Sequence, residues 1–196
     1  AVDNTKPASD SKPKLPFTDV STSDWFYSDV MFVYENGLFS GTDSRSFSPN
    51  ASMTRAMLVT VLYRLEGEPT VTGRSSFTDV RSGAYYEKSV IWAAANGIVT
   101  GTGSTSFSPD AKVTREQLAA ILYRYAQYKK LDTDAGAKLD SFSDAGNVSG
   151  YASEALSWAV SEGLINGASG RLTPKGDATR AQVAAILHRF VENVMD

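Results

Sequence analysis

The stretch "MTRAMLV" at residues 53–59 returns as "VTREQLA" at 113–119 and as "ATRAQVA" at 178–184. In every copy a Thr-Arg pair stands directly before an apolar run, "LVTVLYRL", "LAAILYRY" or "VAAILHRF", that is long enough for a buried helix. A Thr in this place can cap a helix, because its hydroxyl accepts a hydrogen bond from a free N–H of the first turn. The recurrence therefore predicts three helices that begin in the same way. Their expected N-caps are Thr54, Thr114 and Thr179.

The residue three places after each Thr distinguishes the copies. Gln117 and Gln182 complete a Thr-x-x-Gln capping box in the second and third copies. Met57 occupies the same place in the first copy and has no oxygen that could accept a bond from the Thr backbone. We therefore expect the first of the three helices to have the weakest start, by about 1 kcal/mol or less.

Each Thr-Arg pair belongs to a longer repeat that opens with Phe-Thr-Asp or Phe-Ser-Asp. The first halves are "FTDVSTSDWFYSDVMFVYENGLFSG" (17–41), "FTDVRSGAYYEKSVIWAAANGIVTG" (77–101) and "FSDAGNVSGYASEALSWAVSEGLING" (142–167). A Pro-containing turn, "SFSPN", "SFSPD" or "RLTPK", then leads to the Thr-Arg pair. This order predicts helix, loop, helix in each copy, with the first helix of the chain at about 24–36 and a short strand around Phe47.

The three repeats are expected to form one compact all-α module over residues 17–192. The second helices are apolar over most of their circumference, which is typical of buried helices. A helical hairpin of about 50 residues could hardly bury enough surface alone, so a shared core is expected. Residues 1–16 are rich in Pro, Ser, Lys and Asp and predict an exposed linker, with more sequence before it. The repeats are 17–67, 77–128 and 142–192, with polar connectors at 68–76 and 129–140.

Composition excludes several classes of function. The chain has 196 residues, 42% hydrophobic and 21% charged, as expected for an ordered globular protein. A net charge of -3 and a pI near 5.2 argue against a nucleic-acid binder. No apolar run approaches the roughly 20 residues that span a bilayer, so membrane insertion is not expected. The start also lacks the basic-then-apolar pattern of a signal peptide.

Catalytic and metal chemistry is not expected either. The chain has no Cys, so neither a disulfide nor a thiolate metal site can form. His188 is its only His and aligns with Tyr63 and Tyr123, which predicts a packing role. Neither a Ser-His-Asp triad nor a zinc cluster can be located, and "GTDSRSFSPN" lacks the ligand spacing of an EF-hand loop.

The Phe-Thr-Asp-Val opening, the aromatic near the first helix, the Phe-x-Pro turn and the Thr-Arg pair together resemble the S-layer homology domain family. Three tandem copies are usual in that family, and the similarity covers about 17–192. It implies helix-loop-helix repeats arranged with pseudo-threefold symmetry around a central three-helix bundle. The family's Thr-Arg-Ala-Glu signature becomes Thr-Arg-Ala-Met, Thr-Arg-Glu-Gln and Thr-Arg-Ala-Gln, so the Arg is kept and the final Glu is absent.

The resemblance also implies a function. Members anchor bacterial surface proteins non-covalently to secondary cell-wall polysaccharide, commonly pyruvylated, through grooves between adjacent repeats. The expectations for this chain are a secreted protein of the cell surface, cell wall or S-layer, an anionic polysaccharide as partner, and a monomer that folds as a pseudo-trimer. No cofactor, metal or enzymatic activity is expected. The alternative is a structural module that builds a surface layer through protein–protein contacts.

The Arg of each Thr-Arg pair is the candidate ligand for a ketal carboxylate. A guanidinium can bind a carboxylate with two parallel hydrogen bonds. We expect it to project outward from a helix end whose free N–H groups and dipole also favour anions. The alternative role is a structural ion pair. The residues are Arg55, Arg115 and Arg180.

Each copy supplies three further candidates. An Asp ends the Phe-Thr-Asp motif and could accept hydrogen bonds from sugar hydroxyls, or could only cap the local turn. An aromatic residue before the first helix could offer a ring face to a sugar, or could pack within the repeat. A Gly after the helix is expected to serve backbone geometry first while allowing a close ligand approach. These residues are Asp19, Asp79 and Asp144; Trp25, Tyr85 and Tyr151; and Gly41, Gly101 and Gly167.

The third copy departs most from the family pattern. Tyr replaces the usual Trp in the second and third copies, and the third has one extra residue before Tyr151. If the three sites are unequal, the third is therefore expected to be the weakest.

Overall fold

The computed structural model describes residues 14–134 and 136–195, in which every repeat contributes two α-helices joined by a loop. The helices are α1 (Tyr27–Glu35), α2 (Arg55–Leu65), α3 (Glu87–Ala95), α4 (Arg115–Tyr128), α5 (Ser153–Ser161) and α6 (Arg180–Phe190). Short 3-10 turns precede α5, and a π-helical turn follows α6. They are η1 (Leu139–Ser141), η2 (Ala145–Asn147), η3 (Gly150–Ala152) and η4 (Val191–Met195). The described residues contain no β-sheet, which confirms the predicted all-α class.

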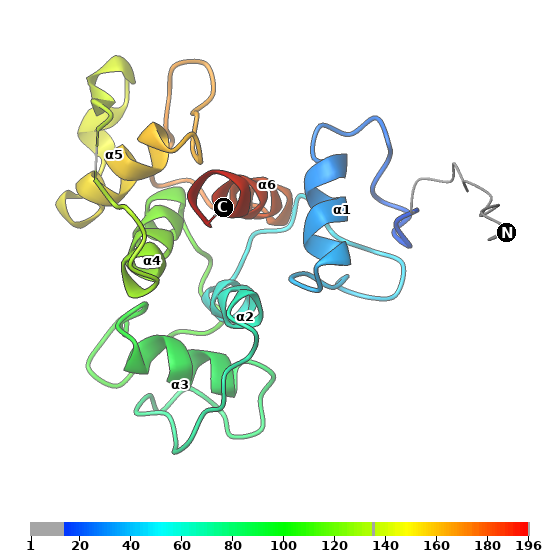
Figure 1. The fold of residues 1–196 in the computed structure, drawn as a ribbon. Helices are drawn as coiled ribbons and strands as arrows, with labels where there is room; N and C mark the ends of the chain where they lie inside the picture. Colours follow the sequence, from blue (N-terminus) through cyan, green and yellow to red (C-terminus); the bar gives the residue numbers. More distant parts are fainter. Residues whose placement is uncertain (1–13, 135, 196) are drawn as a thin grey trace, which may run out of the picture.

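The second helix of each repeat lies toward the middle of the molecule, and the first helix lies outside it (Figure 1). α1 packs against α6, α3 against α2 and α5 against α4, so each outer helix covers the inner helix of the preceding repeat. Tyr63 on α2 meets Trp92 on α3 with ring centroids 5.6 Å apart. His188 on α6 stacks on Phe32 of α1 with ring centroids 4.1 Å apart, which confirms its predicted packing role. The repeats therefore complete one another instead of folding as separate hairpins.

A closed ring of backbone hydrogen bonds joins the three inner helices just before they begin. The N–H of Met53 donates to the carbonyl of Ala178 at 2.8 Å, that of Ala178 to Val113 at 2.8 Å, and that of Val113 to Met53 at 2.9 Å. All three residues are fully buried. Since the same contact passes from each repeat to another and returns to its start, it matches the expected pseudo-threefold arrangement.

The helix starts confirm the capping prediction. The hydroxyl of Thr54 accepts a bond from the N–H of Met57 at 3.2 Å, without a reciprocal side-chain contact. Thr114 and Thr179 each form a complete capping box with the Gln three residues later. At the far end of α4, Tyr125 donates to Glu66 at 2.8 Å and so ties α4 to the end of α2.

Two local expectations are corrected. Phe47 lies in no strand, and the nearest ladder contacts are isolated bridges such as Ser52 with Thr179. Residues 1–13 of the expected linker lie outside the described part of the chain, whereas Leu15 is 5% exposed and belongs to the core. The chain thus joins the folded module two residues before Phe17.

Candidate functional site

Three grooves with the same construction lie at the junctions between repeats. Each lies over the inner helix and loop of one repeat, and takes an Arg from the repeat before it and an aromatic ring from the repeat after it. We number each groove by the repeat that supplies its helix. Groove 1 (about 430 Å³) includes Ser40, Gly41, Met57, Thr60, Arg64, Tyr85 and Arg180. Groove 2 (about 380 Å³) includes Arg55, Thr100, Gly101, Gln117, Ala120, Arg124 and Tyr151. Groove 3 (about 330 Å³) includes Trp25, Arg115, Asn166, Gly167, Gln182, Ala185 and Arg189.

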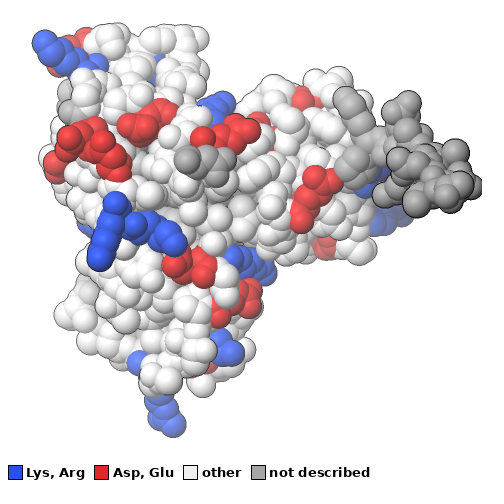
Figure 2. All heavy atoms as spheres, viewed as in Figure 1, with Lys and Arg blue, Asp and Glu red and all other residues white. Residues whose placement is uncertain are grey.

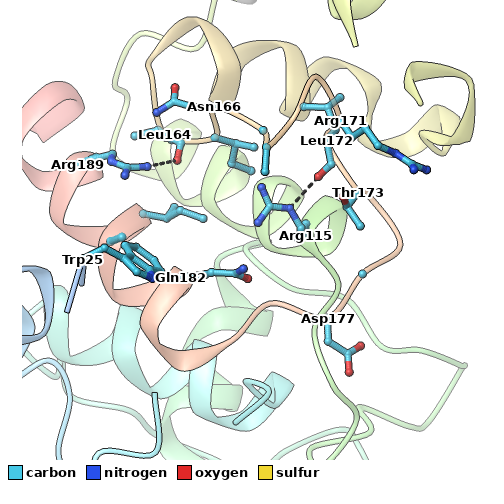
Figure 3. Close-up of a pocket in the computed structure, with 16 residues that line it drawn as sticks. Trp25, Arg115, Leu164, Asn166, Arg171, Leu172, Thr173, Asp177, Gln182 and Arg189 are labelled. Carbon is cyan, nitrogen blue, oxygen red and sulfur yellow. Dashed lines mark hydrogen bonds between the residues drawn. The ribbon is translucent and has the colours of Figure 1, made fainter. Parts of the chain in front are cut away.

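The Arg residues of the Thr-Arg pairs reach from one repeat into the loop of the next. Arg55 donates from Nε to the carbonyl of Phe107 at 2.9 Å and from Nη2 to that of Thr100 at 2.8 Å. Arg180 makes the equivalent bonds to Phe47 and Ser40. Figure 3 shows the third case, in which Nε of Arg115 donates to the carbonyl of Leu172 at 2.8 Å. These side chains therefore tie the repeats together.

This geometry corrects the expectation that the Arg side chains project outward. Arg55 is 8% exposed and Arg180 6%, and burial lowers the pKa of both guanidinium groups from their usual value. Their partners are backbone carbonyls, not the carboxylates of the alternative ion-pair role. Two of the five N–H donors of each guanidinium are used in these bonds, which leaves the remaining donors for a ligand.

The helix ends are also closed. The N–H of Arg55 donates to Ala111 and that of Ala56 to Pro109, both at 2.9 Å. The first two N–H groups of α4 and of α6 donate in the same way to carbonyls of another repeat. Because these first-turn N–H groups already donate to carbonyls, an anion in a groove would have to be bound by side chains.

The Asp residues brace the loop that receives each Arg. The carboxylate of Asp79 accepts the N–H groups of Phe107 and Ser108, at 2.8 and 2.7 Å. Burial alone would raise the pKa of Asp79, but these two amides, with smaller contributions from its own backbone N–H and the Arg55 charge, hold that pKa below its usual value. Ser108 precedes a Pro and has φ +58°, a strained conformation for a non-Gly residue that the carboxylate helps to hold.

The same brace occurs in the other repeats. Asp19 accepts from the N–H groups of Phe47 and Ser48, and Asp144 from those of Leu172 and Thr173, all at 2.8 Å. None of the three Asp side chains lines grooves 1 to 3. The structure thus brings the Arg, aromatic and Gly candidates together and places the Asp candidates behind the loop.

The aromatic candidates line the grooves and are exposed to solvent. Trp25 and Tyr85 are 64% exposed and Tyr151 56%. Trp25 and Tyr85 also meet the next ring of their own repeat edge-on, Phe26 and Tyr86, with ring centroids 5.2 and 5.0 Å apart. Each faces the groove of the preceding repeat, and Trp25 therefore belongs to groove 3. The third copy lends its Tyr151 to groove 2. Both of its departures from the family pattern, the Tyr and the extra residue before it, therefore concern groove 2.

The Gly residues permit the close approach of the loop, as expected. A side chain on Gly101 would place its first carbon 2.5 Å from the carbonyl oxygen of Gly103 and 2.8 Å from the ring of Phe77. Gly41 and Gly167 are crowded in the same manner, and Gly167 also has φ +68°. These positions shape the loop and simultaneously form the groove floor.

The sequence reasoning missed a second Arg in each groove. Arg64, Arg124 and Arg189 lie near the ends of α2, α4 and α6. Arg64 donates to the carbonyl of Leu38 at 3.0 Å, and Arg189 to that of Leu164 at 3.3 Å (Figure 3). The signal was present, because "LYRL", "LYRY" and "LHRF" carry the Arg at the same place in every copy.

The grooves are positively charged although the chain is acidic. Among the described residues, grooves 1 and 2 are each lined by two Arg and no carboxylate. Groove 3 is lined by Arg115, Arg171, Arg189 and Asp177, whose carboxylate pairs with Lys112 at 3.2 Å and lies at the groove's edge (Figure 3). Elsewhere, acidic and basic side chains are interspersed over the visible face (Figure 2). With a net charge of -3, the chain still concentrates cations where its repeats meet.

The sequence model of the S-layer homology domain family matches residues 16–56, 76–119 and 141–184 of this chain. The chain belongs to the S-layer homology domain family. It is 31% identical over 181 residues to an endoglucanase of Bacillus sp. (strain KSM-635), covering 92% of this chain and 19% of that protein. It is 30% identical to an amylopullulanase of Thermoanaerobacterium thermosulfurigenes (90% and 9%). It is also 30% identical to the surface-layer 125 kDa protein of Lysinibacillus sphaericus (84% and 14%).

The S-layer homology module is a non-catalytic, surface-anchoring unit. Because this chain belongs to the family, it is assigned to the cell surface and cell wall. The chain spans less than a fifth of the length of each of these relatives, two of which bear the names of enzymes. Across residues 14–134 and 136–195, no helix has the length and apolar character required to cross a membrane.

Proposed function

We propose that this S-layer homology module anchors a surface protein by binding anionic, pyruvylated secondary cell-wall polysaccharide in grooves 1 to 3. The observation that carries the proposal is the recurrence of two Arg side chains beside one exposed aromatic ring in every groove. A guanidinium is suited to a carboxylate because its planar donors match two carboxylate oxygens. An exposed aromatic ring is suited to the apolar face of a sugar.

In groove 2 the ketal carboxylate would lie between Arg55 and Arg124. Arg55 keeps donors that its two carbonyl bonds do not use, and Arg124 has no hydrogen-bond partner among the described residues. The ring of Tyr151, which lines the same groove, would stack on the sugar. Gly101 lets the backbone approach the ligand without a side chain in between.

Three grooves on one module would raise the strength of attachment to a polymer. Once one groove holds the chain, a neighbouring groove meets the next ketal at a high effective concentration. Weak individual contacts can then add up to a stable anchor, which suits a polysaccharide that offers the same group many times.

The test compares binding of the chain to native cell-wall polymer and to the same polymer after removal of its ketals. The proposal expects binding to fall strongly when the ketals are removed, and equal binding to both polymers would refute it. The variant W25A/Y85A/Y151A removes all three exposed rings and should also weaken binding, whereas R74A, which changes an exposed connector residue, should not.

Simultaneous replacement of the Thr-Arg residues is a poorer test, because Arg55, Arg115 and Arg180 tie the repeats together and their loss would affect folding. Undiminished wall binding by the folded triple aromatic variant would favour the alternative of a protein–protein assembly module.

A further inference from the structure

Groove 2 differs from the other grooves in how its aromatic residue is held. The hydroxyl of Tyr151 donates a hydrogen bond of 3.1 Å to Oε1 of Glu116. The Glu116 side chain is only 4% exposed, so its carboxylate is an acceptor in a fixed place. Burial and this bond together raise the pKa of Tyr151 to about 12, so the phenol stays protonated and continues to donate at neutral pH.

Glu116 is itself held by groups of the third repeat. Its Oε2 accepts the N–H of Ser149 at 3.0 Å, and its Oε1 accepts the hydroxyl of Ser149 at 2.9 Å. Lys175 donates to Oε1 at 2.6 Å and also contacts the Ser149 hydroxyl. A buried carboxylate is stable only when it is paired and hydrogen-bonded, and these contacts satisfy both oxygens. Glu116 is therefore a fixed support for the Tyr151 hydroxyl.

The other grooves lack this support. Glu116 directly follows the Arg of its Thr-Arg pair, and Ala56 and Ala181 occupy the same place in the first and third copies. Among the described residues, no carboxylate accepts a hydrogen bond from Tyr85 or from Trp25. Glu116 is thus the acceptor that distinguishes groove 2 from the other two grooves.

We propose that Glu116 is a positioning residue that holds Tyr151 in a binding-ready orientation and makes groove 2 the pre-organised groove of the three. The inference rests on the proposed function, since it concerns the same anionic sugar ligand. An exposed ring that is free to rotate loses conformational freedom when a sugar stacks on it, and this loss opposes binding. In groove 2 the ring is already held by its hydroxyl while it remains 56% exposed. The ring of Tyr151 is therefore already oriented before the sugar binds.

The binding test uses calorimetric titration of the chain with a methyl hexopyranoside that carries a cyclic pyruvate ketal. The variant W25A/Y85A leaves an aromatic wall in groove 2 alone, and both altered residues are exposed, so the fold should persist. In this background, E116A and Y151F should each weaken ketal binding about 3- to 10-fold, as expected when one side chain must be immobilised on binding. The combination E116A/Y151F should weaken it no further than either change alone.

The matched control is W25A/Y151A, which leaves an aromatic wall in groove 1 alone. E116A added to this control should not alter ketal affinity, because neither Glu116 nor the residues that its carboxylate contacts line groove 1. Four results would overturn the proposal: unchanged affinity of groove 2 in E116A, equal losses in both backgrounds, additive losses in the combined variant, or no ketal binding by W25A/Y85A while the unmodified chain binds.

A second measurement needs no ligand. Nuclear magnetic relaxation of the ring C–H groups in the free chain should show Tyr151 more ordered than Tyr85, and E116A should remove the difference. Equal order of the two rings in the unmodified chain contradicts the proposal. If the unmodified chain fails to bind the ketal, the proposed function is refuted, and the relaxation data still decide whether Glu116 positions Tyr151.

Discussion

Grooves 1 and 2 share one backbone design and differ in the chemistry of their side chains. Groove 1 has Met57 on its helix and an aromatic ring, Tyr85, whose hydroxyl has no carboxylate partner among residues 14–134 and 136–195. Groove 2 has Gln117 at the position that corresponds to Met57, and its aromatic residue, Tyr151, donates a hydrogen bond to Glu116. The repeated fold therefore fixes the place of each groove, while side chains from neighbouring repeats determine its polarity and its hydrogen bonds.

The largest expected effect tests the part that the two grooves share. R55A and R180A should each lower the free energy of unfolding by about 2–4 kcal/mol, because each leaves two loop carbonyls without their donors and opens a gap between repeats. Urea denaturation measures the loss, with R74A as the exposed control. A much smaller loss in one of the two variants would show that the grooves do not share this tie.

The next effect concerns the brace behind groove 2. D79N should lower the free energy of unfolding by about 1–3 kcal/mol, since the amide keeps one acceptor and turns an NH2 group against the Ser108 N–H. D144N should behave alike, because Asp144 makes the same two contacts in the third repeat. Unfolding curves that match the unmodified chain would contradict the bracing role.

Acid should reveal the same brace. The pKa of Asp79 lies below the usual 3.8 in the folded chain, so its stabilisation is complete above that value and is lost as the pH falls through the lower folded pKa. Stability of the unmodified chain should therefore decline below about pH 4 more steeply than that of D79N. Parallel curves of stability against pH between 2 and 5, measured by thermal unfolding at about ten settings, would exclude Asp79 as a contributor.

A smaller effect separates the two aromatic walls. Y151F removes the bond to a buried carboxylate and should lower the free energy of unfolding by about 0.5–1.5 kcal/mol. Y85F, the matched change in groove 1, should have a smaller effect because no carboxylate in the described part of the chain accepts a hydrogen bond from the Tyr85 hydroxyl. Equal effects of the two changes on urea unfolding would remove the distinction between the grooves.

The smallest effect concerns the helix starts. M57Q supplies the acceptor that the first capping box lacks and should raise the free energy of unfolding by about 0.5 kcal/mol. The reverse change Q117M should lower it by a similar amount, because it removes the bond to the Thr114 N–H. A loss of stability in M57Q would show that the packing of Met57 in groove 1 outweighs the missing cap.

Much of the architecture could be predicted from local patterns. The repeat boundaries, the Thr caps and the difference between Met57 and Gln117 depend on residues a few places apart, and the structure confirms these caps. The packing role of His188 followed from its alignment with Tyr63 and was also correct. Patterns of this kind are visible in a single sequence because helix formation and capping are local interactions.

The site was predicted less completely. The Arg, aromatic and Gly candidates line the grooves, but Arg55 and Arg180 are buried ties, Arg115 is a half-buried one, and the Asp residues lie behind the loop. The second set, with Arg64 as its first member, was overlooked although its repetition was visible. The sequence could not decide between the exposed and the packed alternative for Trp25, because its burial depends on the helix of another repeat.

The chain's local order of residues specifies three helix-loop-helix units and the Thr-Arg pair that begins each inner helix. Which residues meet in a groove depends on the folded arrangement, since each groove combines side chains from three repeats. Arg180 reaches Ser40 across 140 residues, and Tyr151 reaches Glu116 across 35. Spacing along the chain carries no record of such partners, because the packing of outer helices onto the inner helices of other repeats brings them together.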